Sequence, residues 1–303
     1  MSCGVVYVAT GEEFLDDAMV SAGTVRETNS SLSIGVITAE SLVDAAEAAP
    51  EFDDIVVATA EFDDIRDKHA NLHLTPYDRT LYLDTDTFVL DDLKPIFEVL
   101  DWFDIAVTHA PFRSVVSIDG VSPAFPEVNG GVIAYRQSEA VASLFERWQA
   151  CFDRQRQEGR PDETIRFSDA KTLDEIPFGR LHDQPPLREA LYHSDIRFTV
   201  MPPEYNFRGP AAYAESAVTV MHMGHSTKAS ALAAVVNDRT EPRVYIDWQR
   251  RLYFQSGDNR AVGLPRLEAY LGHPAVVGTL KKIGVYESVR GLYRRLIGRT
   301  DGL

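Results

Sequence analysis

The chain has 303 residues, 45% of them hydrophobic and 25% charged, which is the composition of a globular protein of one or two domains and not of a disordered one. Its 46 acidic and 30 basic residues give a formal net charge of −16, which argues against nucleic acid as a partner because a phosphate backbone needs a basic surface. No apolar run approaches the roughly 20 residues of a membrane-spanning helix, and two cysteines are too few for a disulfide framework.

Lysine is scarce among the basic residues, which comprise six lysines and 24 arginines. A strongly acidic, lysine-poor surface is typical of a protein that stays soluble in high salt. No basic segment precedes a long apolar stretch near residue 1, so the sequence does not indicate a secretory signal. We therefore expect a halophilic protein of the cytoplasm, with an ordinary acidic protein as the alternative.

The first 60 residues alternate between strand and helix signals. Short apolar runs, typical of buried strands, occupy 5–10, 34–38 and 54–59. Apolar residues at helical spacing occupy 14–26 and 41–49. This β-α-β-α-β order predicts a parallel sheet with helices on its faces.

The chain beyond residue 60 continues the pattern. Further strands are predicted at 80–83, 88–90, 104–108, 128–135, 197–201 and 218–222. A long amphipathic helix is predicted over 138–157. Loops rich in Pro, Ser and Asp occupy 111–127 and 158–180, and long loops on an α/β scaffold more often cover a ligand than do nothing.

Asp84, Thr85 and Asp86 directly follow the apolar strand predicted at 80–83. In an open α/β sheet, ligands bind beyond the carboxyl ends of the strands. Two carboxylates placed together there would repel each other, whereas a divalent cation such as Mg²⁺ or Mn²⁺ would use both as ligands. Other acidic pairs lack a preceding apolar strand and are interpreted as solvated or helix-terminal; they lie at 53–54, 63–64 and 91–92.

The stretch RTLYLDTDTFVLDDLKPIF around these aspartates resembles the Asp-X-Asp region of nucleotide-sugar glycosyltransferases with the GT-A fold. It is most similar to the family 8 retaining transferases, the group that contains glycogenin and bacterial lipooligosaccharide galactosyltransferases. Five other short motifs lie in the family's order over residues 4–230: VVYVATGEEF, VNGGVIAY, DQPPLREAL, RFTVMPPEYNF and VMHMGHSTK. The resemblance implies a Rossmann-like GT-A domain, an α/β fold whose mixed, mainly parallel sheet is flanked by helices.

The resemblance also implies a metal site. The family holds Mn²⁺ or Mg²⁺ between the Asp-X-Asp carboxylates and a late histidine, which gives Asp84, Asp86 and His222 here, since His222 precedes Lys228 by six residues as in the family's motif. The glycine of that motif stands one place early and His225 occupies its position, so His225 remains the alternative ligand. A cation would offset the repulsion between an acidic protein and a diphosphate and would stabilise the departing UDP.

The nucleotide-sugar donor, expected to be a UDP-hexose, would contact several further residues by the same resemblance. Lys68 and Lys228 supply positive charge, and the turn after the first strand lines the nucleoside pocket. The implied donor-binding set is Ala9, Thr10, Gly11, Lys68, Asp84, Thr85, Gly130 and Lys228. From the residues alone, Lys68 also fits a solvated helix position and Lys228 a surface lysine.

Three residues are implied on the sugar side as catalytic. Asn129 would hydrogen-bond the donor sugar or the acceptor while the glycines after it let the sugar approach the backbone, Asp183 would hold sugar hydroxyls, and Gln184 would lie near the anomeric carbon. Alternatives remain open, because Asn129 and the glycines fit a strand bulge, and Asp183 and Gln184 fit the cap of a proline-started helix.

Residues 281–303 contrast with the acidic body, because they hold six basic and two acidic residues among apolar and aromatic ones. A basic amphipathic helix of this kind can lie on an anionic membrane, or it can dock on the acidic body of the protein. We expect a glycosyltransferase domain at 1–265 and a basic helical tail at 266–303, with peripheral contact at the inner face of the membrane through the tail.

The resulting functional hypothesis is metal-dependent transfer of a hexose from a nucleotide-diphosphate sugar, with retention, to a hydroxyl group of a glycan, lipid or protein. One alternative is an inverting GT-A transferase with Glu127 or Asp119 as base; another is a sugar-phosphate nucleotidyltransferase, against which the acidic ATGEEF turn counts. The third alternative is an inactive nucleotide-sugar-binding protein. No hydrolase nucleophile motif, phosphate-binding lysine loop or dinucleotide turn is present.

Overall fold

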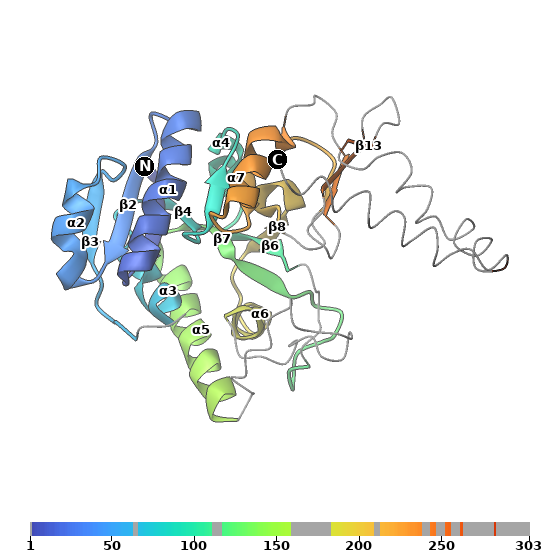
Figure 1. The fold of residues 1–303 in the computed structure, drawn as a ribbon. Coiled ribbons are helices and arrows are strands. Elements are labelled where there is room, and N and C mark those ends of the chain that lie inside the picture. Colours follow the sequence, from blue (N-terminus) through green and yellow to red (C-terminus); the bar gives the residue numbers. More distant parts are fainter. Residues whose placement is uncertain are drawn as a thin grey trace.

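A seven-stranded sheet in the order β3-β2-β1-β4-β7-β6-β8 forms the centre of the fold (Figure 1). The computed structural model describes residues 2–62, 66–110, 117–158, 183–208, 213–237, 243–246, 252–255, 261–262 and 282. The strands are β1 (Cys3–Ala9), β2 (Ser33–Thr38), β3 (Asp54–Val57), β4 (Arg79–Leu83), β6 (Ile105–His109), β7 (Val128–Arg136) and β8 (Phe198–Met201). Neighbouring strands are parallel except that β7 runs antiparallel to both β4 and β6. The predicted mixed, mainly parallel sheet is confirmed.

Alternate side chains of the central strands pack against different helical layers. Val5 and Tyr7 of β1 belong to a buried cluster that includes side chains of α1 (Glu12–Thr28), α2 (Val43–Ala48) and α4 (Lys94–Val99). Val6, between them, belongs to a second cluster with α5 (Glu139–Gln157) and α6 (Gln184–Tyr192). Because strand side chains alternate between faces, a sheet covered on both sides needs apolar residues at every position. This explains the uninterrupted apolar runs in the sequence.

The helices predicted at 14–26, 41–49 and 138–157 lie close to their predicted positions. The structure extends α1 by two residues at each end of the predicted 14–26, and the segment at 41–49 begins as a 3₁₀ turn (Glu40–Leu42) before α2. The predicted helix at 138–157 corresponds to α5. Its start is set by Ser138, whose hydroxyl accepts a hydrogen bond from the N–H of Val141 at 3.3 Å.

Two of the predicted strands lie outside the main sheet. β5 (Thr87–Val89) and β10 (Val220–His222) pair antiparallel with each other, which sets Thr87 opposite His222. The 3₁₀ turn η4 (Pro203–Asn206) precedes β10, and α7 (Thr227–Val236) follows it. Phe88 of β5 and Met221 of β10 pack with Phe207 in a separate buried hydrophobic cluster. The pairing brings the segment after β4 beside residues more than 130 positions later in the chain.

A further four-stranded sheet follows the order β13-β12-β11-β9. Its strands are β9 (Tyr213–Ala214), β11 (Arg243–Ile246), β12 (Leu252–Gln255) and β13 (Ala261–Val262). Of the predicted tail at 266–303 only residue 282 is described, and residues 111–116 and 159–180 of the predicted loops and the acidic pair 63–64 lie outside the described residues. Within the described ranges, no helix combines the length and apolar character needed to cross a membrane. The domain boundary at 265 stays a prediction.

Candidate functional site

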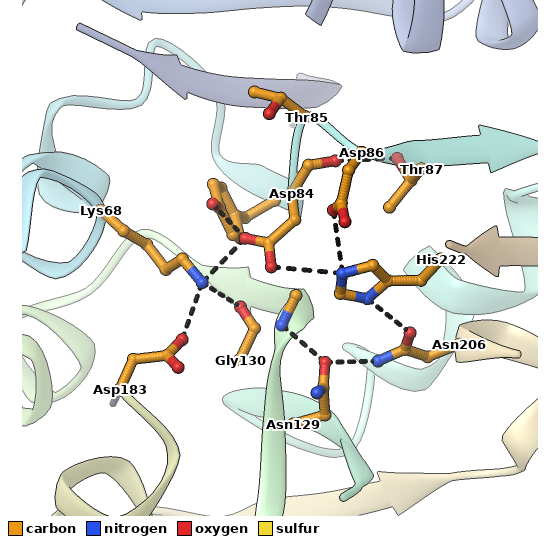
Figure 2. Close-up of polar contacts among 12 residues, drawn as sticks. Lys68, Asp84, Thr85, Asp86, Thr87, Asn129, Gly130, Asp183, Asn206 and His222 are labelled. Atoms are coloured by element: carbon orange, nitrogen blue, oxygen red, sulfur yellow. Dashed lines mark hydrogen bonds and ion pairs between the residues drawn. The ribbon is translucent and has the colours of Figure 1, made fainter. Parts of the chain in front are cut away.

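Asp84 and Asp86 lie on a tight turn at the carboxyl end of β4, the middle strand of the sheet (Figure 2). The N–H of Asp84 donates to the C=O of Gly131 in β7 at 2.8 Å, which extends the strand pairing by one residue. The hydroxyl of Thr87 donates to the C=O of Asp84 at 2.9 Å and closes the turn. Both carboxylates are therefore held at the edge of the sheet where α/β folds bind ligands.

A chain of buried hydroxyl groups fixes this turn from within the fold. Ser21 of α1 lies between Tyr7 of β1 and Thr87, with oxygen–oxygen distances of 2.9 Å to Tyr7 and 2.8 Å to Thr87. Burial raises the pKa of Tyr7 far above its usual value, against the opposing effect of the Ser21 hydroxyl, so the phenol stays neutral. Fully paired buried polar groups rigidify their surroundings. The position of the turn is thus set by β1 and α1 as well as by β4.

His222 reaches the two aspartates from β10. Its Nε2 lies 2.9 Å from Oδ1 of Asp86 and 3.5 Å from Oδ2 of Asp84, and one ligand atom from each of the three residues lies within 4.8 Å of the others. The N–H groups of Met223 and Gly224 donate to the C=O of Asp86 at 3.2 and 2.9 Å. Gly224 has a φ of +75°, a conformation that favours glycine. These contacts tie the end of β10 to the turn after β4.

His225, the alternative ligand, has other partners. Its Nε2 lies 2.8 Å from the C=O of Thr85, and its ring packs edge-on against Phe88 with 4.7 Å between the centroids. The structure therefore brings His222, and not His225, together with Asp84 and Asp86.

Asn206 of η4 orients the His222 ring (Figure 2). Its Nδ2 donates to Oγ1 of Thr108 at 2.8 Å and to Oδ1 of Asn129 at 2.7 Å, so its Oδ1 accepts a hydrogen from Nδ1 of His222, 3.0 Å away. Nε2 is then the ring nitrogen that is available to a cation. Metal-binding histidines commonly donate the N–H of their other ring nitrogen to an acceptor in this way. Two carboxylates and an imidazole are ligands that suit Mn²⁺ or a similar divalent ion. The residues present fit such a cation.

Lys68 is buried beside Asp84 and Asp183. Its Nζ is 2.7 Å from Oδ1 of Asp84, 2.7 Å from Oδ2 of Asp183 and 3.2 Å from the C=O of Gly130. The Tyr82 hydroxyl donates to the same Oδ1 of Asp84 at 2.6 Å. Asp84 therefore has one oxygen engaged by Lys68 and Tyr82, and its Oδ2 is the oxygen on the side of the candidate cation position.

Burial and charge act in opposite directions on the ionisable groups of the site. Burial would lower the pKa of Lys68, but the two aspartates beside it outweigh burial and raise the pKa above its usual value. Burial would raise the pKa of Asp86, but His222, Arg208 and Lys68 outweigh it and hold the pKa below its usual range. Lys68 and Asp86 are therefore both charged at neutral pH.

The short helix that carries Lys68, α3 (Arg66–Asn71), is polar in sequence yet largely buried. Oδ2 of Asp67 accepts a hydrogen bond from the Thr10 hydroxyl at 2.7 Å, and its Oδ1 accepts one from the N–H of Phe62 at 2.6 Å. These bonds hold α3 against the end of β1, where Ala9 is buried and Gly11 precedes α1. The interpretation of Lys68 as a solvated helix residue is wrong, because its partners come from distant parts of the chain.

Gly130 and Gly131 make room for the site's own side chains. A Cβ atom on Gly130 would lie 2.4 Å from Oδ2 of Asp183, and one on Gly131 would lie 2.2 Å from Cε1 of His222 and 2.7 Å from Oδ2 of Asp84. The register of β7 against β6 also shifts in this stretch, so the predicted irregularity in the strand is present as well.

Replacing Gly131 with alanine is expected to lower the affinity for Mn²⁺ by about 10-fold, because the new methyl group must displace the ring of His222 or the carboxylate of Asp84. Overpacking of this kind also costs about 1–3 kcal/mol of folding free energy. Titration calorimetry with MnCl₂ and thermal unfolding measure the two effects. Gly23→Ala is the matched control, since a Cβ there meets nothing within 4 Å. An unchanged Mn²⁺ affinity in Gly131→Ala would contradict the arrangement.

Four further residues were predicted for the site: Asp183, Gln184, Thr85 and Lys228. Asp183 immediately precedes α6, but its side chain makes no capping hydrogen bond, and its C=O accepts the indole N–H of Trp148 at 2.8 Å. Gln184, the first residue of α6, and Thr85, on the turn after β4, are both half-buried. Lys228 is the second residue of α7, and its side chain lies outside the described part.

Two residues of the site, Tyr82 and Asn206, were not predicted from the sequence. Tyr82 lies two residues before Asp84, and residues two apart on a strand share a face, so that spacing was an available signal. Asn206 lies inside the motif RFTVMPPEYNF, for which the resemblance implied no role. Of the bases suggested for an inverting reaction, Glu127 is buried just before β7 and Asp119 is exposed.

No protein-family model matches the sequence, and no curated protein matches it significantly. Solved structures do. The galactosyltransferase LgtC in complex with donor and acceptor sugar analogs is 16% identical with a TM-score of 0.51, over 76% of this chain and 95% of LgtC. The glycosyltransferase GlyE of Streptococcus pneumoniae TIGR4 is 16% identical with a TM-score of 0.45, and this chain spans 47% of its length. At such identities the likeness is one of fold, and the LgtC match confirms the predicted GT-A-like α/β fold.

Proposed function

We propose that this chain is a metal-dependent glycosyltransferase that moves a hexose from a UDP-sugar to a hydroxyl acceptor with retention. The observation that carries the proposal is the convergence of Asp84, Asp86 and His222 at the carboxyl end of β4. That strand lies at the centre of a fold shared with LgtC, a galactosyltransferase whose structure contains donor and acceptor sugar analogs.

Three side chains would hold the cation, Mn²⁺ or Mg²⁺: Asp84 through Oδ2, Asp86 through its carboxylate and His222 through Nε2. When bound, the ion would offset the charge of the diphosphate and stabilise UDP as it leaves. Lys68 and Tyr82 engage the other oxygen of Asp84, which favours one-oxygen ligation by that residue.

The nucleoside would bind beside this centre. β1 and β4 are parallel neighbours, so the turn formed by Ala9, Thr10 and Gly11 leaves the sheet at the same edge as the turn with the two aspartates. The Thr10 hydroxyl is already bonded to Asp67, which supports a structural contribution of Thr10 to the pocket wall.

The hexose would lie over β7, between the Lys68 and Asn206 sides of the site. Asp183 and Asn129 flank the glycine pair there and can hold sugar hydroxyls. In a retaining reaction the departing phosphate can itself take the acceptor proton, so no strong base is required beside it. Asp183 and Gln184 would support the positive charge that develops at the anomeric carbon.

Titration of UDP into the protein in molar KCl, with and without MnCl₂, tests the proposal. Binding that requires Mn²⁺ is expected, and GDP and dTDP serve as matched nucleotides. Absence of metal-dependent binding for all three nucleotides would contradict the donor site. Transfer assays with UDP-hexoses then follow, and an inverted anomer in the product would contradict retention.

A further inference from the structure

Asn206 bonds both to His222, a candidate metal ligand, and to Asn129, a candidate sugar contact, and no role had been expected for it (Figure 2). The residue is buried, with only 6% of its surface exposed. Its amide bonds to Thr108, Asn129 and His222, which come from three different strands of the fold.

The hydrogen-bond pattern assigns the orientation of each of these groups. Oδ1 of Asn129 accepts from the N–H of Gly131 at 2.9 Å and from Nδ2 of Asn206 at 2.7 Å, so its oxygen position is fixed by two donors. Asn206 therefore presents Nδ2 to Asn129 and Oδ1 to His222. An amide oxygen only accepts, so Nδ1 of His222 carries a hydrogen.

The free end of this chain of bonds is Nδ2 of Asn129. That atom is buried and has no hydrogen-bond partner in the ranges that the structure describes. A buried donor without a partner is costly, and such a group commonly serves a ligand. The same two bonds that fix the oxygen of Asn129 hold this donor in place.

We propose that Asn206 is a positioning residue with two roles: it orients His222 in the candidate metal site and Asn129 in the proposed sugar site. Through Oδ1 it keeps Nδ1 of His222 protonated, with Nε2 toward Asp84 and Asp86. Through Nδ2 it locks the amide of Asn129 so that its unpartnered donor serves an oxygen of the donor sugar. This second part rests on the proposed function, whereas the first part concerns the protein alone.

Two substitutions separate these two roles. Asn206→Leu removes the hydrogen bonds to both His222 and Asn129. Asn206→Asp keeps an oxygen acceptor for His222 but places an oxygen where Nδ2 donated, so it faces Oδ1 of Asn129. Asn129 cannot relieve this clash by rotating its amide, because its Nδ2 would then face the N–H of Gly131.

The first readout is the Nδ1–H of His222 in ¹⁵N-edited spectra of the metal-free protein, assigned to His222 with His222→Gln and to Nδ1 rather than Nε2 by the couplings of each ring nitrogen to the ring C–H protons. Because His222 is 2% exposed, its Nδ1–H should exchange slowly with water. We expect this signal in the wild type and in Asn206→Asp, and its loss in Asn206→Leu. Its absence from the wild type, or its persistence in Asn206→Leu, would overturn the proposal whether or not the chain transfers sugar.

The second readout is calorimetry with MnCl₂ and then with a UDP-hexose. Loss of a hydrogen bond behind a metal-binding histidine typically costs about 10- to 100-fold in metal affinity, which is expected for Asn206→Leu. Asn206→Asp should bind Mn²⁺ within about threefold of wild type but bind the UDP-hexose about 10-fold more weakly. Unchanged Mn²⁺ affinity in Asn206→Leu would overturn the role of Asn206 in orienting His222. Unchanged affinity for the UDP-hexose in Asn206→Asp would overturn its role in orienting Asn129.

Asn237→Leu is the matched control for a general loss of stability. Asn237 bonds the N–H and C=O of Val218, just before β10, at 2.8 and 2.7 Å and has no bond to His222. If Asn237→Leu weakened Mn²⁺ binding as much as Asn206→Leu does, the effect would be structural and the positioning role would be rejected. If the wild type binds Mn²⁺ but no UDP-sugar, the proposed function fails while the role of Asn206 in orienting His222 stands.

Discussion

Asp84→Asn and Asp86→Asn are each expected to lower metal-dependent turnover of a UDP-hexose by roughly 10³-fold while the protein stays folded. Oδ2 of Asp84 and Oδ1 of Asp86 are the carboxylate oxygens that approach Nε2 of His222. Asparagine keeps the size of the side chain but removes its charge, and hard divalent cations prefer charged oxygen ligands. Initial rates at saturating donor, measured over a range of MnCl₂ concentrations, give the effect.

The binding of the cation can be followed separately from turnover. A ligand that binds only the folded state adds about 2.7 kcal/mol to the free energy of unfolding at 100 times its Kd. The melting temperature of the wild type should therefore rise when MnCl₂ is added, and that of Asp84→Asn and Asp86→Asn should not. This comparison distinguishes loss of the metal from loss of a later step.

Asp91→Asn and Asp92→Asn are the matched controls, because both residues are exposed acidic side chains shortly after β5. Each substitution removes one negative charge from the same region of an acidic chain and should leave both turnover and the Mn²⁺-dependent rise in melting temperature unchanged. Full activity in both site variants, or equal losses in the site and control variants, would contradict the assignment of the metal ligands.

Periodicity in the sequence located the strands of the main sheet and the helices α1, α2 and α5, but not α4, α7 or the strands β9 and β11 to β13. The helix predicted at 138–157 and α5 (Glu139–Gln157) nearly coincide, because a long amphipathic pattern with a serine cap is a strong local signal. Periodicity carries no information about strand direction. The antiparallel course of β7, and the pairing of β5 with β10 outside the main sheet, depend on contacts between distant segments.

The polar helix α3 shows why burial was harder to predict than secondary structure. From the sequence alone, Lys68 also fitted a solvated helix position, because its neighbours are polar. Asp67, Lys68 and Asn71 are all buried, because their partners come from the turn after β1, from the residue before α6 and from the segment after β3. A local pattern cannot reveal a partner that lies 115 residues away, as Asp183 lies from Lys68.

The same reasoning applies to the site. Asp84, Asp86 and His222 were predicted from short motifs, whose order matched a known family. Asn206 was not, because its bonds span 77 residues to Asn129 and 16 residues to His222 and have no signature in spacing. Although Asn206 lies inside one of the motifs, its role became apparent only from these contacts.

Lys68→Met is expected to lower kcat/KM for a UDP-hexose by about 10²-fold without weakening Mn²⁺ binding. Nζ of Lys68 is 2.7 Å from an oxygen of Asp84 and from one of Asp183, so it joins the cation side of the site to the sugar side. Removing the ammonium leaves Asp183 without this buried cation. Because it also removes a positive charge beside a candidate metal ligand, the attraction of the site for a divalent cation should stay equal or increase.

Loss of a buried ion pair destabilises a fold by about 3–5 kcal/mol, so the variant must be shown to be folded by circular dichroism at the assay temperature. Lys94→Met is the matched control, because the Lys94 side chain is 75% exposed and its ion pair with Glu98 is long, at 3.6 Å. Calorimetry with MnCl₂ then decides between two roles. If Mn²⁺ affinity falls in parallel with kcat/KM, Lys68 acts by holding Asp84 for the metal. If Mn²⁺ affinity is kept while kcat/KM falls, which is the expected result, Lys68 acts through Asp183 on the sugar.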